Sequence, residues 1–561
     1  MEVPKSPSKD KRFAKHKSLF KIAAISLIIM TLLSLGFYLE SDHSTLNASS
    51  YYTVVIDCGS TGTRVNVYEW RRMVGGVMSK PNLPILLHSY PDSATNSSRS
   101  RSKASCQYHC MQTEPGLDKM ANDSLGVRQA LEPLIVWAEH LVPRELRSET
   151  PIFVLATAGM RRLRSVDAGR VLGDVEAVLK EHSFMFSKRW IRVLTGREEA
   201  YYGWLALNYK MGSFDHDTGA PTLGLVDLGG SSLQVVMEID GQQDDVHAMR
   251  SELSTVEHRI LAYSLPAFGL NEAFDRTVLM LRNNQSVERT RSVPELRHPC
   301  LMSTLVQNYT CYYCSGFDVA YQKNDSQPQK TGLHSLRLIG EPDWEQCREL
   351  AIAAAMNLSN YGVSHPAVHK NCQANSFSGT GILNLTAVML PIKQFHALSG
   401  FFVVYNKLNL SPKANLTTVW ESGKEICSNL WAGLSSISDN PNYAGQFCFQ
   451  VAYMASLIEY GLCLGDVEMV FGPGDVSWTL GAALIEGKFL WLNTTSLKAQ
   501  TIISTLKNVK VMSSSTFLFA VLLLLLFIVY FSQIKLPMPS RRASTPSLTL
   551  PSCTLTRRRS N

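Results

Sequence analysis

Two stretches of the chain share one pattern of apolar and polar positions. Each is an apolar run that ends in an aspartate, followed by a turn rich in Gly, Ser and Thr and then by a second apolar run; they cover residues 53–65 and 223–235. Short apolar runs that are bounded by turn residues are typical of buried strands. The pattern therefore predicts two strand–turn–strand units whose aspartates, Asp57 and Asp227, are 170 residues apart.

The rest of the pattern predicts strands that alternate with helices. Apolar residues recur at helical spacing over 124–141, whereas 151–157 and 191–194 are short apolar runs typical of strands, the second leading into a helix. A further strand, turn and small-residue helix are predicted over 469–482. Residues 240–450 are less periodic, and we expect a second lobe with long loops there. Alternation of this kind predicts a layered α/β fold.

Two uncharged apolar segments flank this region, at residues 22–39 and 512–534. They contain 18 and 23 residues, and about 20 apolar residues cross a bilayer. Basic residues lie on the outer side of each segment, so we expect two transmembrane helices with both tails in the cytoplasm. A cleaved signal peptide is the alternative for the first segment, although no small-residue cleavage site follows it.

The predicted organisation follows from these boundaries. It comprises a basic tail (1–21), a transmembrane helix (22–39), a stalk (40–50), lobe I (51–195, with 475–496 returning to it), lobe II (196–474), a second stalk (497–511), a second transmembrane helix (512–534) and a second basic tail (535–561). The net charge of +7 comes from tails of +5 and +6, so the segment between them carries −4. A nucleic-acid-binding surface is therefore not expected.

Sequons and cysteines place the middle of the chain in the lumen or outside the cell. All eleven Asn-x-Ser/Thr sequons lie between Asn47 and Asn493, outside both tails. Ten of the twelve cysteines lie between Cys106 and Cys463, which is typical of structural disulfides in an oxidising compartment. We suggest one pairing, Cys427–Cys448. The membrane is either Golgi or another endomembrane, or the plasma membrane.

The two glycine-rich turns carry the candidate chemistry. Glycine lets the backbone approach a ligand closely, and successive N–H groups in such a turn bind anions. An aspartate at each strand end is suited to hold a hydrated divalent cation, Ca²⁺ or Mg²⁺. Two such turns that face each other would grip a polyphosphate from both sides.

Five stretches together resemble the conserved regions of the GDA1/CD39 nucleoside phosphatases, or apyrases. They are 57–64, 156–161, 195–204, 227–234 and 478–482, in the family's order. The resemblance is to the two-pass membrane type and includes the plant members. It implies a duplicated two-lobed fold of the actin/Hsp70/hexokinase (RNase H-like) type. The implied activity is hydrolysis of the terminal phosphate of nucleoside tri- and diphosphates, ending at the monophosphate.

The resemblance also implies roles for single residues. Glu199 would be the general base, and Ser232 and Gln234 would orient the attacking water. Asp57 and Asp227 would hold Ca²⁺ or Mg²⁺, mostly through water. The implied phosphate-binding residues are Ser60, Thr61, Gly62, Thr63, Arg64, Thr157, Gly229, Gly230 and Ser231.

Other residues keep more than one interpretation. Glu198, beside Glu199, fits a helix-capping box with Thr195, and Arg161 is expected to form a structural ion pair. Phe402 and Trp478 are weaker candidates for the nucleoside pocket. A phosphotransferase of the same fold and a non-catalytic nucleotide-binding receptor are the alternative functions. The expected partners are nucleotides, the bilayer and a second copy of the chain.

Overall fold

The computed structural model describes most of the chain between the predicted membrane segments. The described ranges are 50–71, 83–91, 111–214, 221–239, 246–251, 253, 257–284, 294–311, 334–358, 382–383, 394–432 and 441–492. They fall within one compact unit, Ser44–Leu492. The segments 22–39 and 512–534 lie outside the described residues. Within these ranges, no helix has both the length and the apolar character that a membrane crossing requires.

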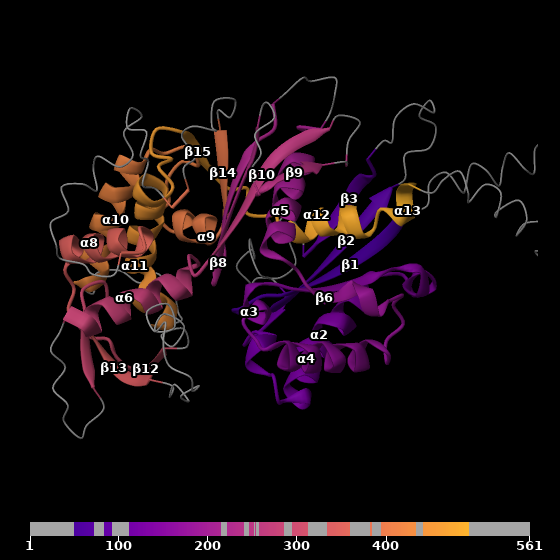
Figure 1. The fold of residues 1–561 in the computed structure, drawn as a ribbon, viewed down its shortest axis with the longest axis horizontal. Helices are drawn as coiled ribbons and strands as arrows, with labels where there is room; N and C mark the ends of the chain where they lie inside the picture. Colours follow the sequence, from indigo (N-terminus) through magenta and orange to yellow (C-terminus); the bar gives the residue numbers. More distant parts are fainter. Residues whose placement is uncertain are drawn as a thin grey trace, which may run out of the picture. The chain divides into compact units, whose positions relative to one another are not determined.

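The first lobe is built on a mixed six-stranded sheet (Figure 1). Its main path runs β3 (Ile85–Tyr90), β2 (Thr63–Arg71), β1 (Ser50–Cys58), β5 (Ile152–Ala156) and β6 (Ile191–Val193), and β4 (Gln112–Thr113) pairs with β2. The first three strands are antiparallel, whereas β5 and β6 run parallel to β1. The strands predicted over 53–65, 151–157 and 191–194 are thereby confirmed.

Both faces of this sheet are covered. Alternate β1 residues such as Val54 and Ile56 pack against α2 (Ser124–Leu141) and α4 (Ser165–Leu179), whereas Val55 faces the opposite side. Helix α2 has the limits that its apolar spacing predicted. Asp123 caps it by accepting a hydrogen bond from the Gly126 N–H at 2.8 Å.

The second lobe repeats the strand order of the first. Its sheet runs β15 (Glu468–Phe471), β14 (Gln394–Ser399), β7 (Gly224–Leu228), β8 (Ser232–Glu238), β10 (His258–Pro266) and β9 (Ala248–Ser251). Here β7, β8 and β10 are antiparallel neighbours, and β14 and β15 continue in parallel from β7. This matches β1, β2, β3, β5 and β6 strand for strand, as a duplicated fold requires.

Helices α5 (Gly196–Lys210) and α12 (Trp478–Glu486) lie between the two sheets (Figure 1). One buried apolar cluster contains residues of both helices and of both sheets, including Trp204 and Leu480. The helices approach so closely at Gly481 that a Cβ there would lie 2.0 Å from the Tyr202 carbonyl oxygen. The site between the sheets is therefore framed by a packed core.

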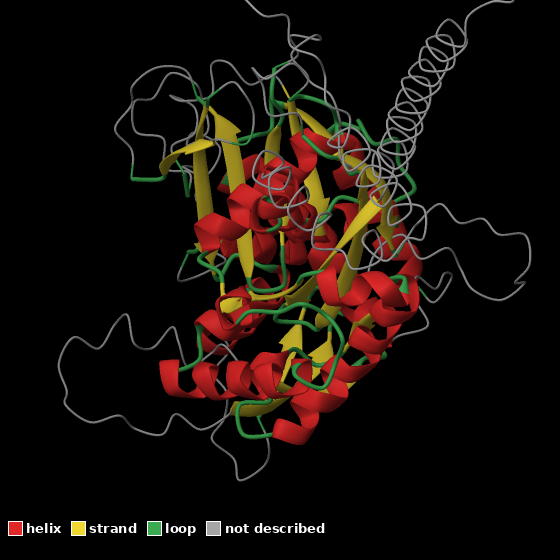
Figure 2. Ribbon diagram, turned by 90° about the vertical axis from the view of Figure 1, so that its right-hand side faces the viewer, coloured by secondary structure: helices red, strands yellow, loops and turns green. Residues whose placement is uncertain are grey.

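The second lobe is more regular than its sequence predicted. Over 240–450 the structure places α6 (Leu270–Asn284), α8 (Trp344–Ala355), α9 (Gly400–Asn406), α10 (Leu416–Trp431) and α11 (Pro441–Ser456). A three-stranded sheet is formed by β11 (Glu295–His298), β13 (His334–Gly340) and β12 (Val306–Cys311). Figure 2 shows helices packed against the strands of the sheets. The apolar faces of these helices pack into the core of this lobe, and in α6 and α10 the apolar residues recur at helical spacing as clearly as they do in α2.

Disulfides connect helices and turns of this lobe. The suggested Cys427–Cys448 bridge is confirmed, and a second joins Cys300 to Cys347. The first ties α10 to α11 and the second ties the turn after β11 to α8. Cys58, in β1, is a buried free thiol.

Candidate functional site

The two glycine-rich turns have the same backbone geometry. In the first, between β1 and β2, the Gly59 N–H donates to the Gly62 carbonyl at 3.0 Å. In the second, between β7 and β8, the Gly229 N–H donates to the Ser232 carbonyl at 2.9 Å. The repeated sequence pattern therefore corresponds to one repeated turn, each at the end of the central strand of its sheet.

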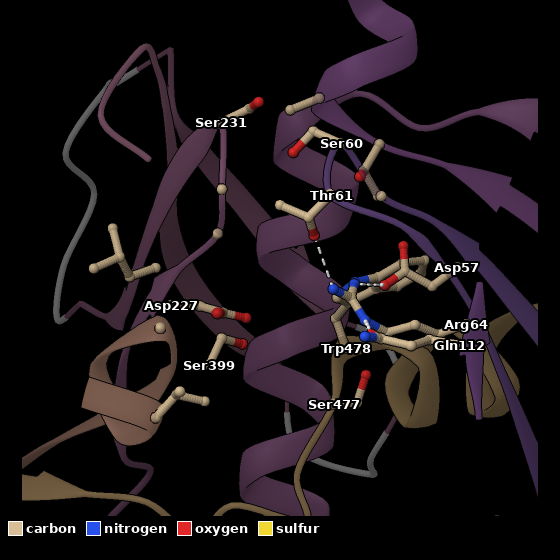
Figure 3. A pocket seen from close by; sticks show the side chains of 18 of the residues that line it. Asp57, Ser60, Thr61, Arg64, Gln112, Asp227, Ser231, Ser399, Ser477 and Trp478 are labelled. Carbon is tan, nitrogen blue, oxygen red and sulfur yellow. Dashed lines mark hydrogen bonds and ion pairs between the residues drawn. The ribbon is translucent and has the colours of Figure 1, made fainter. Parts of the chain in front are cut away.

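The turns face each other across a cleft of about 710 Å³ (Figure 3). A Cβ placed on Gly230 would lie 2.8 Å from Cγ2 of Thr61 and 3.0 Å from Oγ of Ser60. A side chain at position 230 would therefore require the Thr61 and Ser60 side chains to move. Ser231 Oγ is buried and has no hydrogen-bond partner, which leaves it available for a ligand.

Asp57 and Arg64 form the first charged pair of the cleft. Arg64 donates from one guanidinium nitrogen to Asp57 Oδ2 at 3.3 Å and from another to Thr61 Oγ1 at 2.9 Å. Its Nε donates to Gln112 Oε1 at 3.3 Å. Arg64 thus lines the cleft and also holds the first turn in place through Thr61.

Asp227 is the counterpart of Asp57 in the second lobe. Burial raises its pKa to about 6, and the nearby charge of Asp57 acts in the same direction, against a hydrogen bond from Ser399. Burial likewise raises the pKa of Asp57, although Arg64 opposes this. The two aspartates therefore lie close enough to repel each other, from opposite walls of the cleft (Figure 3).

The aspartate pair fits a hydrated divalent cation. Asp57 Oδ1 is buried and has no hydrogen-bond partner, and a cation would relieve the repulsion between the two carboxylates. Across the ranges that the structure describes, no group of three or more His, Cys, Asp or Glu side chains is placed to ligate a metal. Mg²⁺ usually takes one or two carboxylates together with water and phosphate oxygens, which suits this pair.

Glu199 lies one turn into α5 and is paired with Arg161. The Arg161 guanidinium, at the end of α3 (Ala158–Arg161), donates to Glu199 Oε2 at 2.9 Å and to the Leu194 carbonyl at 3.1 Å. Burial, opposed by Arg161 and assisted by Asp57 and Asp227, raises the pKa of Glu199 to about 7. A carboxylate that titrates near neutral pH is suited to general-base catalysis.

Glu198 is the helix cap that its spacing predicted. Its carboxylate accepts a hydrogen bond from the Thr195 backbone N–H at 2.8 Å, while Thr195 Oγ1 accepts from the Glu198 N–H at 3.2 Å. Burial opposes ionisation, but the hydrogen bonds from Thr195 and Arg192 prevail and lower the pKa of Glu198. The capping box fixes the first turn of α5, from which Glu199 points into the cleft.

Ser232 and Gln234 lie side by side on β8. Gln234 Nε2 donates to Ser232 Oγ at 2.7 Å and to Ser264 Oγ at 3.4 Å. Both residues are almost fully buried and both line the cleft together with Glu199. The chain of polar groups fixes the Ser232 hydroxyl in one position.

Three predicted residues do not line the cleft. Gly62 and Thr63 are packed behind the first turn, where a Cβ on Gly62 would lie 2.7 Å from the Thr113 carbonyl oxygen. Phe402 packs against Gly472 and Gly474, also outside the cleft lining. Thr157 and Trp478 do line it, and Trp478 belongs to the central apolar cluster as well.

Sequence reasoning missed several residues that the structure brings to the cleft. Ser399 contacts Asp227 and has a positive φ of 53°, an uncommon backbone state for a residue with a side chain. Its signal was available, since Ser399-Gly400 follows a buried strand as the other turns do. Gln112, Asn271, Gln446 and Gln450 also line the cleft, and no local pattern marks them.

Comparison with known proteins agrees with this geometry. The GDA1/CD39 (nucleoside phosphatase) family profile matches residues 43–502. Probable apyrase 7 of Arabidopsis thaliana is 36% identical over 85% of this chain; the chain spans 63% of that relative's length. Ectonucleoside triphosphate diphosphohydrolase 3 of Mus musculus is 26% identical, and the match covers 82% of this chain and 83% of that relative's length.

A solved structure shares the fold. The nucleoside triphosphate hydrolase structure from Neospora caninum superposes with a TM-score of 0.51 at 16% identity, covering 81% of this chain and 96% of that one. The mixed α/β, two-lobed, actin-like fold that the five stretches implied is therefore confirmed. With a family profile matched over most of its length, the chain belongs to the GDA1/CD39 nucleoside phosphatases.

Proposed function

We propose that this protein hydrolyses the terminal phosphate of nucleoside tri- and diphosphates and stops at the monophosphate. One observation carries the proposal: two matching N–H-rich turns, one from each sheet, face each other beside the carboxylate of Glu199, whose side chain is only 12% exposed and whose pKa is raised to about 7. The turns suit two linked phosphates, and the carboxylate suits an attacking water. Cleavage requires a phosphoanhydride, so a nucleoside monophosphate is not a substrate.

Different residues of the chain would bind the phosphates and activate the water. The Ser60–Thr61 and Gly229–Ser231 backbone would hold the phosphate oxygens, with the Ser231 hydroxyl as a further donor. Glu199 would accept the proton from water as it attacks in line, and Ser232 and Gln234 would fix the position of that water. Arg161 would keep Glu199 ionised and correctly oriented.

Asp57 and Asp227 would hold Ca²⁺ or Mg²⁺ through its water shell. When bound, the cation neutralises charge that develops on the phosphate oxygens. The two carboxylates supply the charge that attracts it, and among the described residues that line the cleft Arg64 is the only lysine or arginine.

A panel of phosphate-release assays tests the function. The purified protein is given ATP, ADP, UDP, GDP and AMP, with and without a chelator. We expect release from the tri- and diphosphates, no release from AMP, and loss of activity with chelator that added Ca²⁺ or Mg²⁺ restores. Release from AMP, or chelator-resistant activity, would contradict the proposal.

We further propose that the described unit lies in the lumen or outside the cell, between two membrane anchors at 22–39 and 512–534. The exposed sequon asparagines Asn122, Asn308 and Asn415 and the two disulfides support this. In sealed microsomes, protease should remove only the tails, and glycosidase should reduce the mass of the protected fragment. Digestion of the unit in intact vesicles would contradict this topology.

A further inference from the structure

Gln450 presents an unpaired polar atom to the cleft. It lies on α11, its residue is 7% exposed, and Oε1 has no hydrogen-bond partner. It lines the cleft together with Gln446, one helical turn earlier. A buried polar atom without a partner is rare in proteins and is costly to keep.

Gln450 is a polar residue within an apolar stretch of α11. Its neighbours Phe449 and Val451 are fully buried, and both belong to the core of the second lobe. One turn further along α11, the Tyr453 hydroxyl donates to the Phe268 carbonyl at 2.9 Å, which fixes the helix against the turn before α6. The helix is thus firmly placed, and the Gln450 carboxamide is held in the cleft by rigid elements.

The hydrogen-bonding groups of a nucleotide indicate which part of it can bind Gln450 Oε1. A carbonyl oxygen needs a hydrogen-bond donor, and phosphate oxygens at neutral pH are acceptors. The two N–H-rich turns already supply hydrogen-bond donors for the phosphate oxygens. The donors of a nucleotide are the ribose hydroxyls and the N–H groups of the base, so the nucleoside is the part that fits Gln450.

The helices that pack against α11 offer a surface for a nucleoside. Leu270 and Val403 line the same cleft as the two glutamines and supply apolar contact, and they belong to α6 and α9, both of which pack against α11. Among the described lining residues, aromatic rings come from Tyr68 and Trp478, which belong to β2 and α12 and not to this wall. Hydrogen bonding by carboxamides, with aliphatic contact, is therefore the recognition that this wall provides.

We infer that Gln450 is a specificity-determining residue that accepts a hydrogen bond from the nucleoside and so favours nucleotides over bare polyphosphate chains. The inference rests on the proposed hydrolysis, because it assigns a residue of that same cleft. It predicts that Gln450 contributes to the binding of a nucleotide and contributes nothing to the binding of its phosphate tail.

The test compares a nucleotide with a polyphosphate that lacks a nucleoside. In wild type and Gln450→Met, which keeps the side-chain length without the amide, we measure kcat and KM for ATP and the inhibition constant of inorganic tripolyphosphate. Loss of one neutral hydrogen bond should raise KM for ATP by about three- to tenfold. We expect kcat to change less than twofold and the tripolyphosphate constant to stay unchanged. Gln129→Met, on the exposed face of α2 outside the cleft, is the matched control.

The outcomes separate the two proposals. If wild type releases no phosphate from ATP, the proposed function fails. If it does, but Gln450→Met changes both constants by one factor or changes neither, the specificity inference fails. Should Gln450→Met lose all activity, Gln450→Asn, which shortens the carboxamide by one methylene, is measured in the same way. Repeating the comparison with 2′,3′-dideoxy-ATP identifies the donor: the effect of the variant disappears if a ribose hydroxyl donates and persists if the base does.

Discussion

The ion pair between Arg161 and Glu199 predicts a displaced pH profile when the arginine is removed. The two side chains are 24% and 12% exposed, so solvent screens the pair only weakly, and the atoms are 2.9 Å apart. Burial raises the pKa of Glu199 and Arg161 opposes that rise, so that the pKa in the intact site is about 7. Arg161→Met removes that opposing charge and leaves the carboxylate beside Asp57 and Asp227. The pKa of Glu199 should therefore rise.

The size of the rise follows from the contact. A hydrogen bond to a charged partner contributes about 1.5–3 kcal/mol, and 1.36 kcal/mol corresponds to one pH unit. The pKa of Glu199 should thus rise by about one to two pH units. A general base acts when it is deprotonated, so the acidic limb of kcat/KM should move to higher pH. Activity at pH 7 should fall by roughly tenfold and recover at higher pH.

The assay is phosphate release from ATP, with kcat/KM measured across the pH range for wild type, Arg161→Met and Arg161→Lys. The lysine keeps the positive charge, so its profile should lie closer to that of wild type. Arg164→Met is the control, because Arg164 is 84% exposed and pairs only locally with Asp167. A profile that is lowered equally at every pH, with an unmoved midpoint, would mean that Arg161 has only a structural role and would refute the reasoning.

Three further predictions follow from single contacts. Glu199→Gln should lower kcat by about 10²–10⁴ while nucleotide binding, measured by calorimetry, persists; unchanged turnover would contradict its role as the base. Asp57→Asn should raise the Mg²⁺ concentration needed for half-maximal activity, and an unchanged cation titration would contradict the cation assignment. Gly481→Ala would place a Cβ 2.0 Å from the Tyr202 carbonyl oxygen and should lower the melting temperature by several degrees, since overpacking costs about 1–3 kcal/mol. Gly169→Ala, whose Cβ meets nothing within 4 Å, should leave it unchanged or raise it.

Local sequence patterns predicted the elements whose turns form the phosphate end of the site, together with one helix that covers the first sheet. The apolar spacing over 124–141 matches α2, and the two strand–turn–strand units match β1–β2 and β7–β8. In each case the residues that determine the element are neighbours in sequence, so the period or the turn residues carry the information. The capping box of Thr195 and Glu198 was predictable for the same reason, because it joins residues three positions apart.

Contacts between residues far apart in the chain could not be predicted from the sequence alone. Arg161 was correctly expected in an ion pair, but its partner, 38 residues away on another helix, gives it a place in the site. Ser399 comes beside Asp227 because β14 pairs with β7 in a register that sets Leu398 opposite Asp227. Such a register depends on the assembled sheet. The regularity of the second lobe was underestimated for a different reason, since α6 and α10 do carry apolar residues at helical spacing and this local signal was overlooked.

This division between local and distant contacts has a chemical counterpart in the cleft. The phosphate end is made by backbone N–H groups of two short turns, and any chain that keeps those turns keeps that chemistry. The Gln450 wall is made by side chains of α6, α9 and α11, whose positions are set by packing and not by a turn motif. The start of α6 also supports the second turn, because the N–H groups of Leu270 and Asn271 donate to the Gly229 and Gly230 carbonyls. Substitutions on α9 and α11 are therefore the ones that can alter what is bound while leaving the hydrogen bonds of the turns in place.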